Sequence, residues 1–161
     1  MHDGPGLQRL RELIGEVRIA LLTTLDGEGQ MHTRPIETLQ CEPDGTLWFF
    51  TACDSPKSAE LRHDTRVSLG YSHPGKSIYV AVSGVGSVGR DIAKAAELWS
   101  PGQLAFYPQG LEDPRLALLK VRLERAEYWV TPGKASYVLA AVNAALTGTP
   151  AGVLGENRKL P

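Results

Sequence analysis

Turn-forming residues divide most of this chain into short runs of β-prone residues. The 161 residues include 17 glycines and 11 prolines, about 17% of the chain against a usual share of about 12%. Turn sequences such as Asp26-Gly27 and Asp44-Gly45 stand between the runs. The runs cover residues 19–25, 31–40, 47–51, 67–71, 77–88 and 118–130. Because short turns join most of them, the pattern predicts a mainly β fold, a closed or partly closed antiparallel barrel of six strands.

Helical periodicity is expected only at the periphery of this barrel. Apolar residues at helical spacing predict an amphipathic N-terminal helix over residues 4–17. Further helices are predicted from Ser55-Pro56 to about residue 63, over 91–99, and at the C-terminus over about 134–146. The uncharged stretch 135–155 is long enough to cross a bilayer, but polar residues and glycines interrupt it, so we expect a docked helix followed by a loop. No linker or repeat divides the chain, which predicts one domain over residues 1–161.

Charge and cysteine content exclude several classes of partner. The net charge of −1 gives no long-range field, so we expect no binding to nucleic acid, and no membrane partner. Cys41 and Cys53 cannot build a disulfide framework. Charged residues interrupt the apolar positions near the N-terminus, as they would not in a leader peptide. We therefore expect reduced thiols and a cytoplasmic location.

The segment from Gly84 to Gly89 matches the pattern GxGxxG, which is typical of dinucleotide-binding loops. That fold needs a second parallel strand soon after the next helix, but Ser100-Pro101-Gly102 follows and predicts a loop. Strand alternation also continues through the glycines. We therefore interpret the segment as a bent barrel strand.

The segment from Thr51 to Lys57 is a stronger candidate for binding an anion. The N–H groups at a helix start attract phosphate, and Lys57 adds a full charge in the first turn. Ser55 offers a hydroxyl, and Arg34 on a neighbouring strand offers a planar guanidinium. The alternative is that Ser55 only caps the helix and Lys57 is a solvated surface lysine, and spacing alone favours that alternative.

The sequence assigns no catalytic side chain and no metal ligand. The histidines are His2, His32, His63 and His73, and none of them is spaced like a zinc-binding pair. Neither GxSxG nor SxxK occurs, so no serine hydrolase motif is present.

Seven segments in chain order resemble one protein family. They are His32-Thr33-Arg34-Pro35-Ile36, Leu47-Trp48-Phe49-Phe50-Thr51, Ser55-Pro56-Lys57, Tyr79-Val80-Ala81-Val82-Ser83-Gly84, Glu97-Leu98-Trp99, Tyr107-Pro108-Gln109-Gly110 with Asp113-Pro114, and Glu127-Tyr128-Trp129. Together they resemble the general stress protein 26 group of the pyridoxamine 5′-phosphate oxidase-like, FMN-binding split-barrel superfamily.

The resemblance implies a six-stranded antiparallel split β-barrel with FMN as cofactor. It also implies a homodimer, with the flavin bound in clefts at the subunit interface. The cofactor-binding residues that it implies are Arg34, Pro35, Ile36, Glu37, Phe50, Thr51, Ser55, Lys57 and Trp99. The sequence departs from the group at Ile36 (usually Met), Phe106 (usually Trp) and Val130 (usually Asp). Pro56 stands where true oxidases of the superfamily carry a basic residue.

The function implied is that of a stress-related, FMN-dependent oxidoreductase that acts on an unknown small molecule. Two alternatives stay open: a non-catalytic flavin carrier or sensor, and a relative that binds another flat cofactor, deazaflavin or haem. We do not expect a true pyridoxamine 5′-phosphate oxidase. The C-terminal region lacks the basic cluster for a second phosphate, and Arg158-Lys159 read as a solvated tail. Eleven aromatic residues exceed what one small barrel needs to fill its interior, which favours a homodimer.

Overall fold

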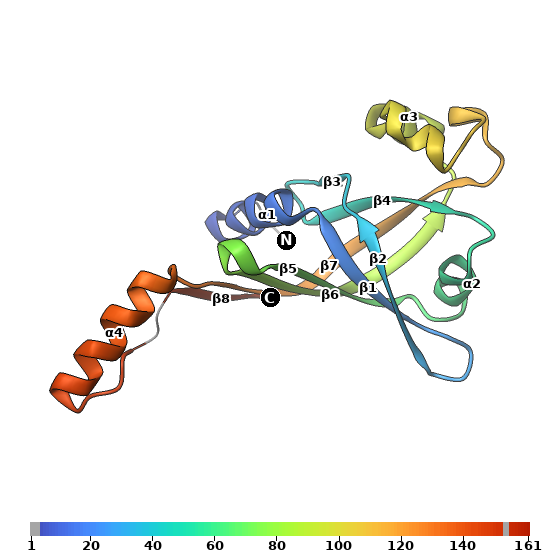
Figure 1. Cartoon of the computed structure of the whole chain (residues 1–161). Helices are drawn as coiled ribbons and strands as arrows, with labels where there is room; N and C mark the ends of the chain where they lie inside the picture. The colour runs from blue at the N-terminus through green and yellow to red at the C-terminus, as the bar shows by residue number, and fades with distance from the viewer. Residues whose placement is uncertain (1–3, 153–154) are drawn as a thin grey trace.

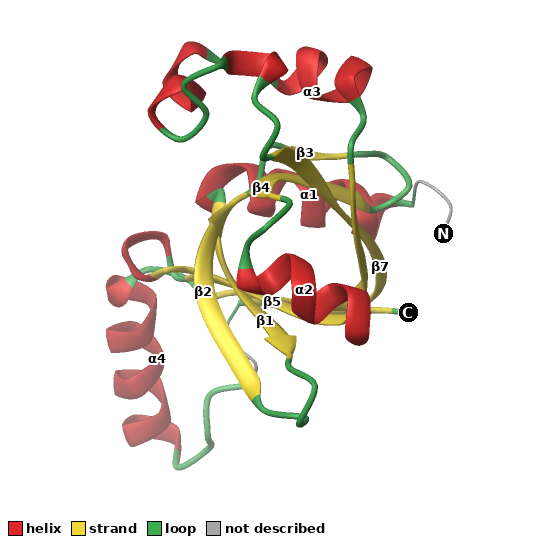
Figure 2. Ribbon diagram, turned by 90° about the vertical axis from the view of Figure 1, so that its right-hand side faces the viewer, coloured by secondary structure: helices red, strands yellow, loops and turns green. Residues whose placement is uncertain are grey.

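The strands form one antiparallel sheet that curls into a barrel (Figures 1 and 2). The structure is a computed structural model that describes residues 4–152 and 155–161. The strands are β1 (Ile19–Leu25), β2 (Met31–Glu37), β3 (Gln40–Cys41), β4 (Thr46–Ala52), β5 (Arg66–His73), β6 (Ile78–Gly89), β7 (Leu116–Val130) and β8 (Glu156–Leu160). Their order in the sheet is β2-β1-β5-β6-β7-β4-β3, and β8 pairs with β7. This arrangement confirms the predicted mainly β fold with peripheral helices.

The sheet has eight strands, two more than the six predicted, and the difference arises at two places in the chain. The predicted strand 31–40 breaks at Thr38-Leu39, where the N–H of Thr38 donates to Arg18 and the N–H of Leu39 donates to Trp48. The chain thus leaves β1 and joins β4 within two residues, which creates β2 and β3. The expected C-terminal tail is the second difference, because residues 156–160 form β8 and pair with residues 126–130 of β7.

The helices lie around the sheet. They are α1 (Pro5–Val17), α2 (Pro56–His63), α3 (Ile92–Leu98) and α4 (Lys134–Thr147), with short 3-10 turns at Pro74–Lys76, Pro101–Ala105 and Gly110–Glu112. Helix α1 buries Leu10 and Leu13 against the inner faces of the strands, where Leu22, Phe49 and Tyr128 are also fully buried. This apolar interior holds α1 and the curled sheet together.

Helix α4 projects from the body of the protein (Figure 1). It has no buried residue, and none of its hydrogen bonds reaches another helix or strand of the described chain. The expectation of a docked helix is therefore wrong for this single chain; residues 153 and 154 of the expected loop lie outside the described residues. The exposed apolar side chains are Tyr137, Val138, Leu139, Val142 and Leu146. Among the described helices, none has both the length and the apolar character needed to cross a membrane.

The glycine-rich segment 84–89 lies in strand β6, as the interpretation as a bent strand predicts. The register with β7 shifts between Ser83 and Gly84. A Cβ atom added at Gly84 would collide with the backbone carbonyl oxygen of Arg122. Glycine is therefore required at this bulge because the two backbones approach closely there.

We predict that Gly84→Ala lowers the free energy of unfolding by about 1–3 kcal/mol, because the bulge must shift to admit the methyl group. Urea unfolding followed by tryptophan fluorescence measures this loss. Gly89→Ala is the matched control in the same strand, since its added Cβ meets no heavy atom within 4 Å. Equal stability of the two variants would contradict this role of Gly84.

Candidate functional site

A cleft of about 400 Å³ opens where β2 and β4 approach each other across the split of the barrel. Its walls come from β2 with Leu39, from β4 and the start of α2, and from the loop before β7. The lining residues are Pro35, Ile36, Glu37, Leu39, Phe50, Thr51, Ala52, Lys57, Gln103, Phe106, Tyr107 and Arg115. Six of the nine residues predicted from the sequence thus line one cleft, and its volume lies in the usual range for a small-molecule site, about 300–1,000 Å³.

Aromatic residues brace one side of the cleft. Phe50 on β4 packs edge-on against Trp99, with ring centroids 5.8 Å apart, and against Tyr107, at 6.3 Å. Trp99 is therefore a support behind Phe50 and does not itself line the cleft. Edge-on aromatic pairs of this kind favour a defined ring geometry, so Phe50 is held in place.

The start of α2 supplies one cation of the cleft, Lys57. The hydroxyl of Ser55 caps the helix by accepting from the N–H of Ser58 at 3.4 Å, and it also lies 2.9 Å from Oγ of Ser58. Ser55 is thus engaged as a cap and is not among the lining residues. Lys57 is half-buried in the cleft, and no ion pair joins it to another described residue. Burial lowers the pKa of the Lys57 ammonium, and the nearby Arg34 lowers it further.

Arg34 lies beside the cleft and is already paired. Its Nη2 donates to Oε2 of Glu60 at 2.8 Å, and its Nη1 donates to the hydroxyl of Thr24 and to the carbonyl of His32. His32 Nδ1 lies 2.7 Å from the other carboxylate oxygen of Glu60. Glu60 on α2 is buried, so it neutralises Arg34 in a partly dehydrated site. Lys57 is therefore the cation of α2 that lines the cleft without an ion pair to another described residue.

Glu60 and the loop residues were not predicted from the sequence. Glu60 follows Lys57 by three positions on α2, and only its burial beside β1 and β2 distinguishes it from a surface carboxylate. Tyr107 belongs to an aromatic pair that the sequence displays, but no local pattern points to Arg115. Its place in the cleft depends on the pairing of β4 with β7.

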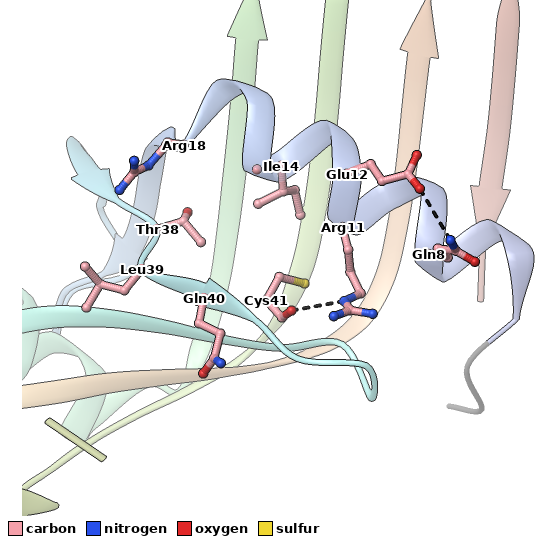
Figure 3. A pocket seen from close by; sticks show the side chains of 10 residues that line it. Gln8, Arg11, Glu12, Ile14, Arg18, Thr38, Leu39, Gln40 and Cys41 are labelled. Carbon is pink, nitrogen blue, oxygen red and sulfur yellow. Dashed lines mark hydrogen bonds between the residues drawn. The ribbon is translucent and has the colours of Figure 1, made fainter. Parts of the chain in front are cut away.

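A larger hollow of about 630 Å³ lies between α1 and the segment that joins β2 to β3 (Figure 3). It contains none of the predicted site residues. Its polar groups bond to one another, since Nε of Arg11 donates to the carbonyl of Cys41 at 3.0 Å and Gln8 donates to Glu12. Burial raises the pKa of the Cys41 thiol to about 12, so the thiol stays protonated. This hollow shows no reactive group.

The comparisons with known proteins agree with the fold. A model of the family described as pyridoxamine 5′-phosphate oxidase like matches residues 6–151. The solved structure of the general stress FMN/FAD binding protein from Xanthomonas citri is 32% identical, with a TM-score of 0.69 and a match that covers 80% of this chain and 90% of that one. General stress protein 26 from Bacillus anthracis str. Sterne is 22% identical, with a TM-score of 0.64 over 74% of this chain and 93% of that one. Protein bli-3 of Neurospora crassa is 25% identical over 150 residues, 84% of this chain and 70% of that protein.

A curled antiparallel sheet with a cleft at its split and a helix start beside that cleft defines a split-barrel protein. The family match spans nearly the whole chain, and the chain belongs to the pyridoxamine 5′-phosphate oxidase-like family. The resemblance to the general stress protein 26 group is confirmed with it.

Glu60 gives the site a pH-dependent contribution to stability. Burial acts to raise the pKa of Glu60, but hydrogen bonds from Thr24, Arg34 and His32 outweigh it and hold the pKa below the ordinary 4.5. The unfolded chain therefore takes up this proton more readily than the folded one. The stability from this carboxylate is present above about pH 4.5 and is lost as the pH falls through the lower pKa of the folded state.

We predict that Glu60→Gln lowers the free energy of unfolding at neutral pH by about 1–3 kcal/mol, because Arg34 loses its charged partner. The variant also loses part of the wild-type decline in stability below about pH 4.5. Urea titrations at a series of pH values measure both effects. Glu124→Gln, which removes a carboxylate from the exposed face of β7, is the control; an equal effect there would contradict the role given to Glu60.

Proposed function

We propose that this cleft binds FMN and that the protein is a stress-related flavoprotein. The observation that carries the proposal is the junction of an apolar floor with one unpaired cation: Ile36 and Phe50 line the same cleft as Lys57. A flat aromatic ring fits the floor between β2 and β4. A terminal phosphate fits the α2 start, where Lys57 and the first N–H groups attract an anion. The Xanthomonas citri relative is described as an FMN/FAD binding protein, which supports the choice of a flavin as cofactor.

The chain's own contribution to chemistry is positioning, since bound flavin supplies the redox function. Three of the ionisable residues in the cleft are poorly suited to proton transfer near neutral pH. Glu37 is ion-paired with Arg18 at 2.9 Å, and burial raises the pKa of Tyr107 to about 12. Arg115 pairs with Asp113 at 3.5 Å, and a guanidinium offers donors but no acceptor. We therefore propose an oxidoreductase in which Lys57 is engaged by the cofactor phosphate and substrate or solvent provides the protons.

The alternatives make different demands on the cleft. Haem requires an axial ligand, and the described residues that line the cleft include no His, Cys or Met. A flavin carrier or sensor would use the same contacts as an oxidoreductase, and turnover of bound FMN with a reduced nicotinamide separates the two. Deazaflavin is separated from flavin by the absorption spectrum of the purified protein. Oxidation of pyridoxamine 5′-phosphate is not proposed, because the described part of the cleft lining has no second basic cluster for its phosphate.

We predict that the protein binds FMN more tightly than riboflavin, and that Lys57→Ala removes about 1.5–3 kcal/mol of FMN affinity. Isothermal calorimetry with both ligands measures the preference, since riboflavin lacks the phosphate. Lys76→Ala, at an exposed lysine outside the cleft, is the control. Equal affinity of the wild type for the two ligands would refute the phosphate site.

We further propose that a second copy of the chain completes the assembly and covers α4. The accessible surface is 9296 Å², whereas a compact monomer of 17.4 kDa is expected to expose about 7,900 Å². The difference of about 1,400 Å² exceeds the roughly 800 Å² that each partner buries in a standard interface. On α4 the exposed side chains of Leu139, Val142 and Leu146 follow one another at helical spacing and form an apolar face.

We predict a homodimer of about twice the 17.4 kDa chain mass in sedimentation equilibrium at micromolar concentration. Val142→Glu should shift the dimer towards monomer, because it places a charge on the apolar face of α4. Ala141→Glu, which lies off that face on the same helix, is the matched control. A wild-type monomer at these concentrations would overturn the assembly, and a dimer unaffected by Val142→Glu would exclude α4 from the interface.

A further inference from the structure

At the start of α2, where the phosphate would bind, the positive charge of Lys57 does not balance the charge of a phosphate. A terminal phosphate carries about −1.5 to −2 at neutral pH, and Lys57 supplies a single positive charge. Arg34 is neutralised by Glu60, Ser55 is engaged as a helix cap, and Pro56 brings no charge. Burying an incompletely paired dianion is costly. If the cleft holds FMN, a second cation is needed near Lys57.

The strand pairing brings Arg115 to this place. Ala52 at the end of β4 pairs with Leu116 at the start of β7, and the N–H of Cys53 donates to the carbonyl of Arg115 at 2.8 Å. Arg115 thus stands beside the turn that leads into α2. Its side chain lines the same cleft as Lys57, although 58 positions separate the two residues in the sequence.

The guanidinium of Arg115 also has a carboxylate partner, but a more distant one than Arg34 has in Glu60. Its Nη2 donates to the carbonyl of Phe106 at 3.0 Å, and its Nε lies 3.5 Å from the buried carboxylate of Asp113. Nη1 has no hydrogen-bond partner among the described residues. About half of the side chain is exposed. The anchoring contacts limit the rotamers of a long side chain, so less conformational entropy is lost when a ligand binds.

Asp113 is suited to act as the anchor. Burial acts to raise its pKa, but hydrogen bonds from the backbone N–H groups of Arg115 and Gln109 outweigh burial and leave the pKa below its ordinary value. The carboxylate is therefore ionised at neutral pH. Backbone N–H groups satisfy most of the hydrogen-bonding capacity of Asp113. Its remaining contact with Arg115 orients the guanidinium, and other N–H groups of the guanidinium stay available for a ligand.

We propose that Arg115 is a specificity-determining residue that binds the phosphate of the flavin together with Lys57. This inference rests on the proposed function, because it holds only if the cleft binds FMN. The guanidinium fork matches two phosphate oxygens, while Lys57 acts as a point charge at the helix start. The alternative is a purely structural role, in which Arg115 only ties the loop at Phe106 to β7.

Flavin fluorescence quenching tests the proposal by measuring the dissociation constants of FMN and riboflavin for the full-length protein and its variants. We expect Arg115→Ala to weaken FMN binding about 10- to 100-fold and to leave riboflavin binding unchanged. Arg115→Lys keeps the charge without the fork and should recover part of the loss. Arg90→Ala is the matched control, because Arg90 donates to the neighbouring carbonyl of Pro114 at 3.4 Å but does not line the cleft.

The outcomes distinguish a failure of the Arg115 proposal from a failure of the proposed function. Equal weakening of FMN and riboflavin by Arg115→Ala would show a structural role and overturn the proposal, as would unchanged FMN binding. Urea unfolding of Arg115→Ala reveals any loss of the fold, and Arg115→Lys keeps the test valid if Arg115→Ala is unstable. A wild type that binds riboflavin as tightly as FMN would instead refute the phosphate site itself, and a wild type that binds no flavin would refute the proposed function.

Discussion

The cleft depends on a change of hydrogen-bond partner at Thr38-Leu39, where the chain leaves β1 and joins β4. The N–H groups of these adjacent residues donate to opposite parts of the sheet, Thr38 to Arg18 and Leu39 to Trp48. Buried backbone N–H groups need hydrogen-bond partners, and here the chain finds them in two consecutive residues as it crosses from one end of the strand order to the other. This crossing holds β2 near β4 without pairing them. The gap that remains is the cleft, and Leu39 itself lines it.

The charges around this gap are distributed so that one helix carries both a buried anion and an unpaired cation. Glu60 lies inside, where three side chains donate or pair with it, and Lys57 lies three positions earlier at the cleft. A buried carboxylate without partners would be costly, which explains why His32, Arg34 and Thr24 gather there. The same pairing removes Arg34 from the charge available to a ligand. Binding of an anion then depends on the cations outside the Glu60 network.

The sequence predicted the features that depend on local patterns and missed those that depend on long-range register. Turn residues and β-prone runs located the strands, and Ser55-Pro56 located α2, because each signal lies within a few residues. The switch at Thr38-Leu39 is not visible locally, since both residues continue a β-prone run and only their partners differ. Strand β8 is short, polar and exposed, so no hydrophobic alternation marks it. The cleft residues on β2, β4 and α2 were predicted from family motifs, whereas Arg115 depends on the register of β4 with β7.

The two sides of the cleft differ in how freely their residues can be substituted. The floor consists of strand residues in a hydrogen-bonded sheet, so changes there disturb the barrel. The opposite wall is the loop that carries Gln103, Phe106 and Tyr107, and only Tyr107 of these is buried, against Phe50. Phe106 is 69% exposed although it lines the cleft. Loops on a rigid scaffold commonly determine what is recognised. In the proposed function the cofactor would therefore lie on the floor, and the choice of substrate would depend on this loop, in which Tyr107 is buried and Phe106 is exposed to a ligand.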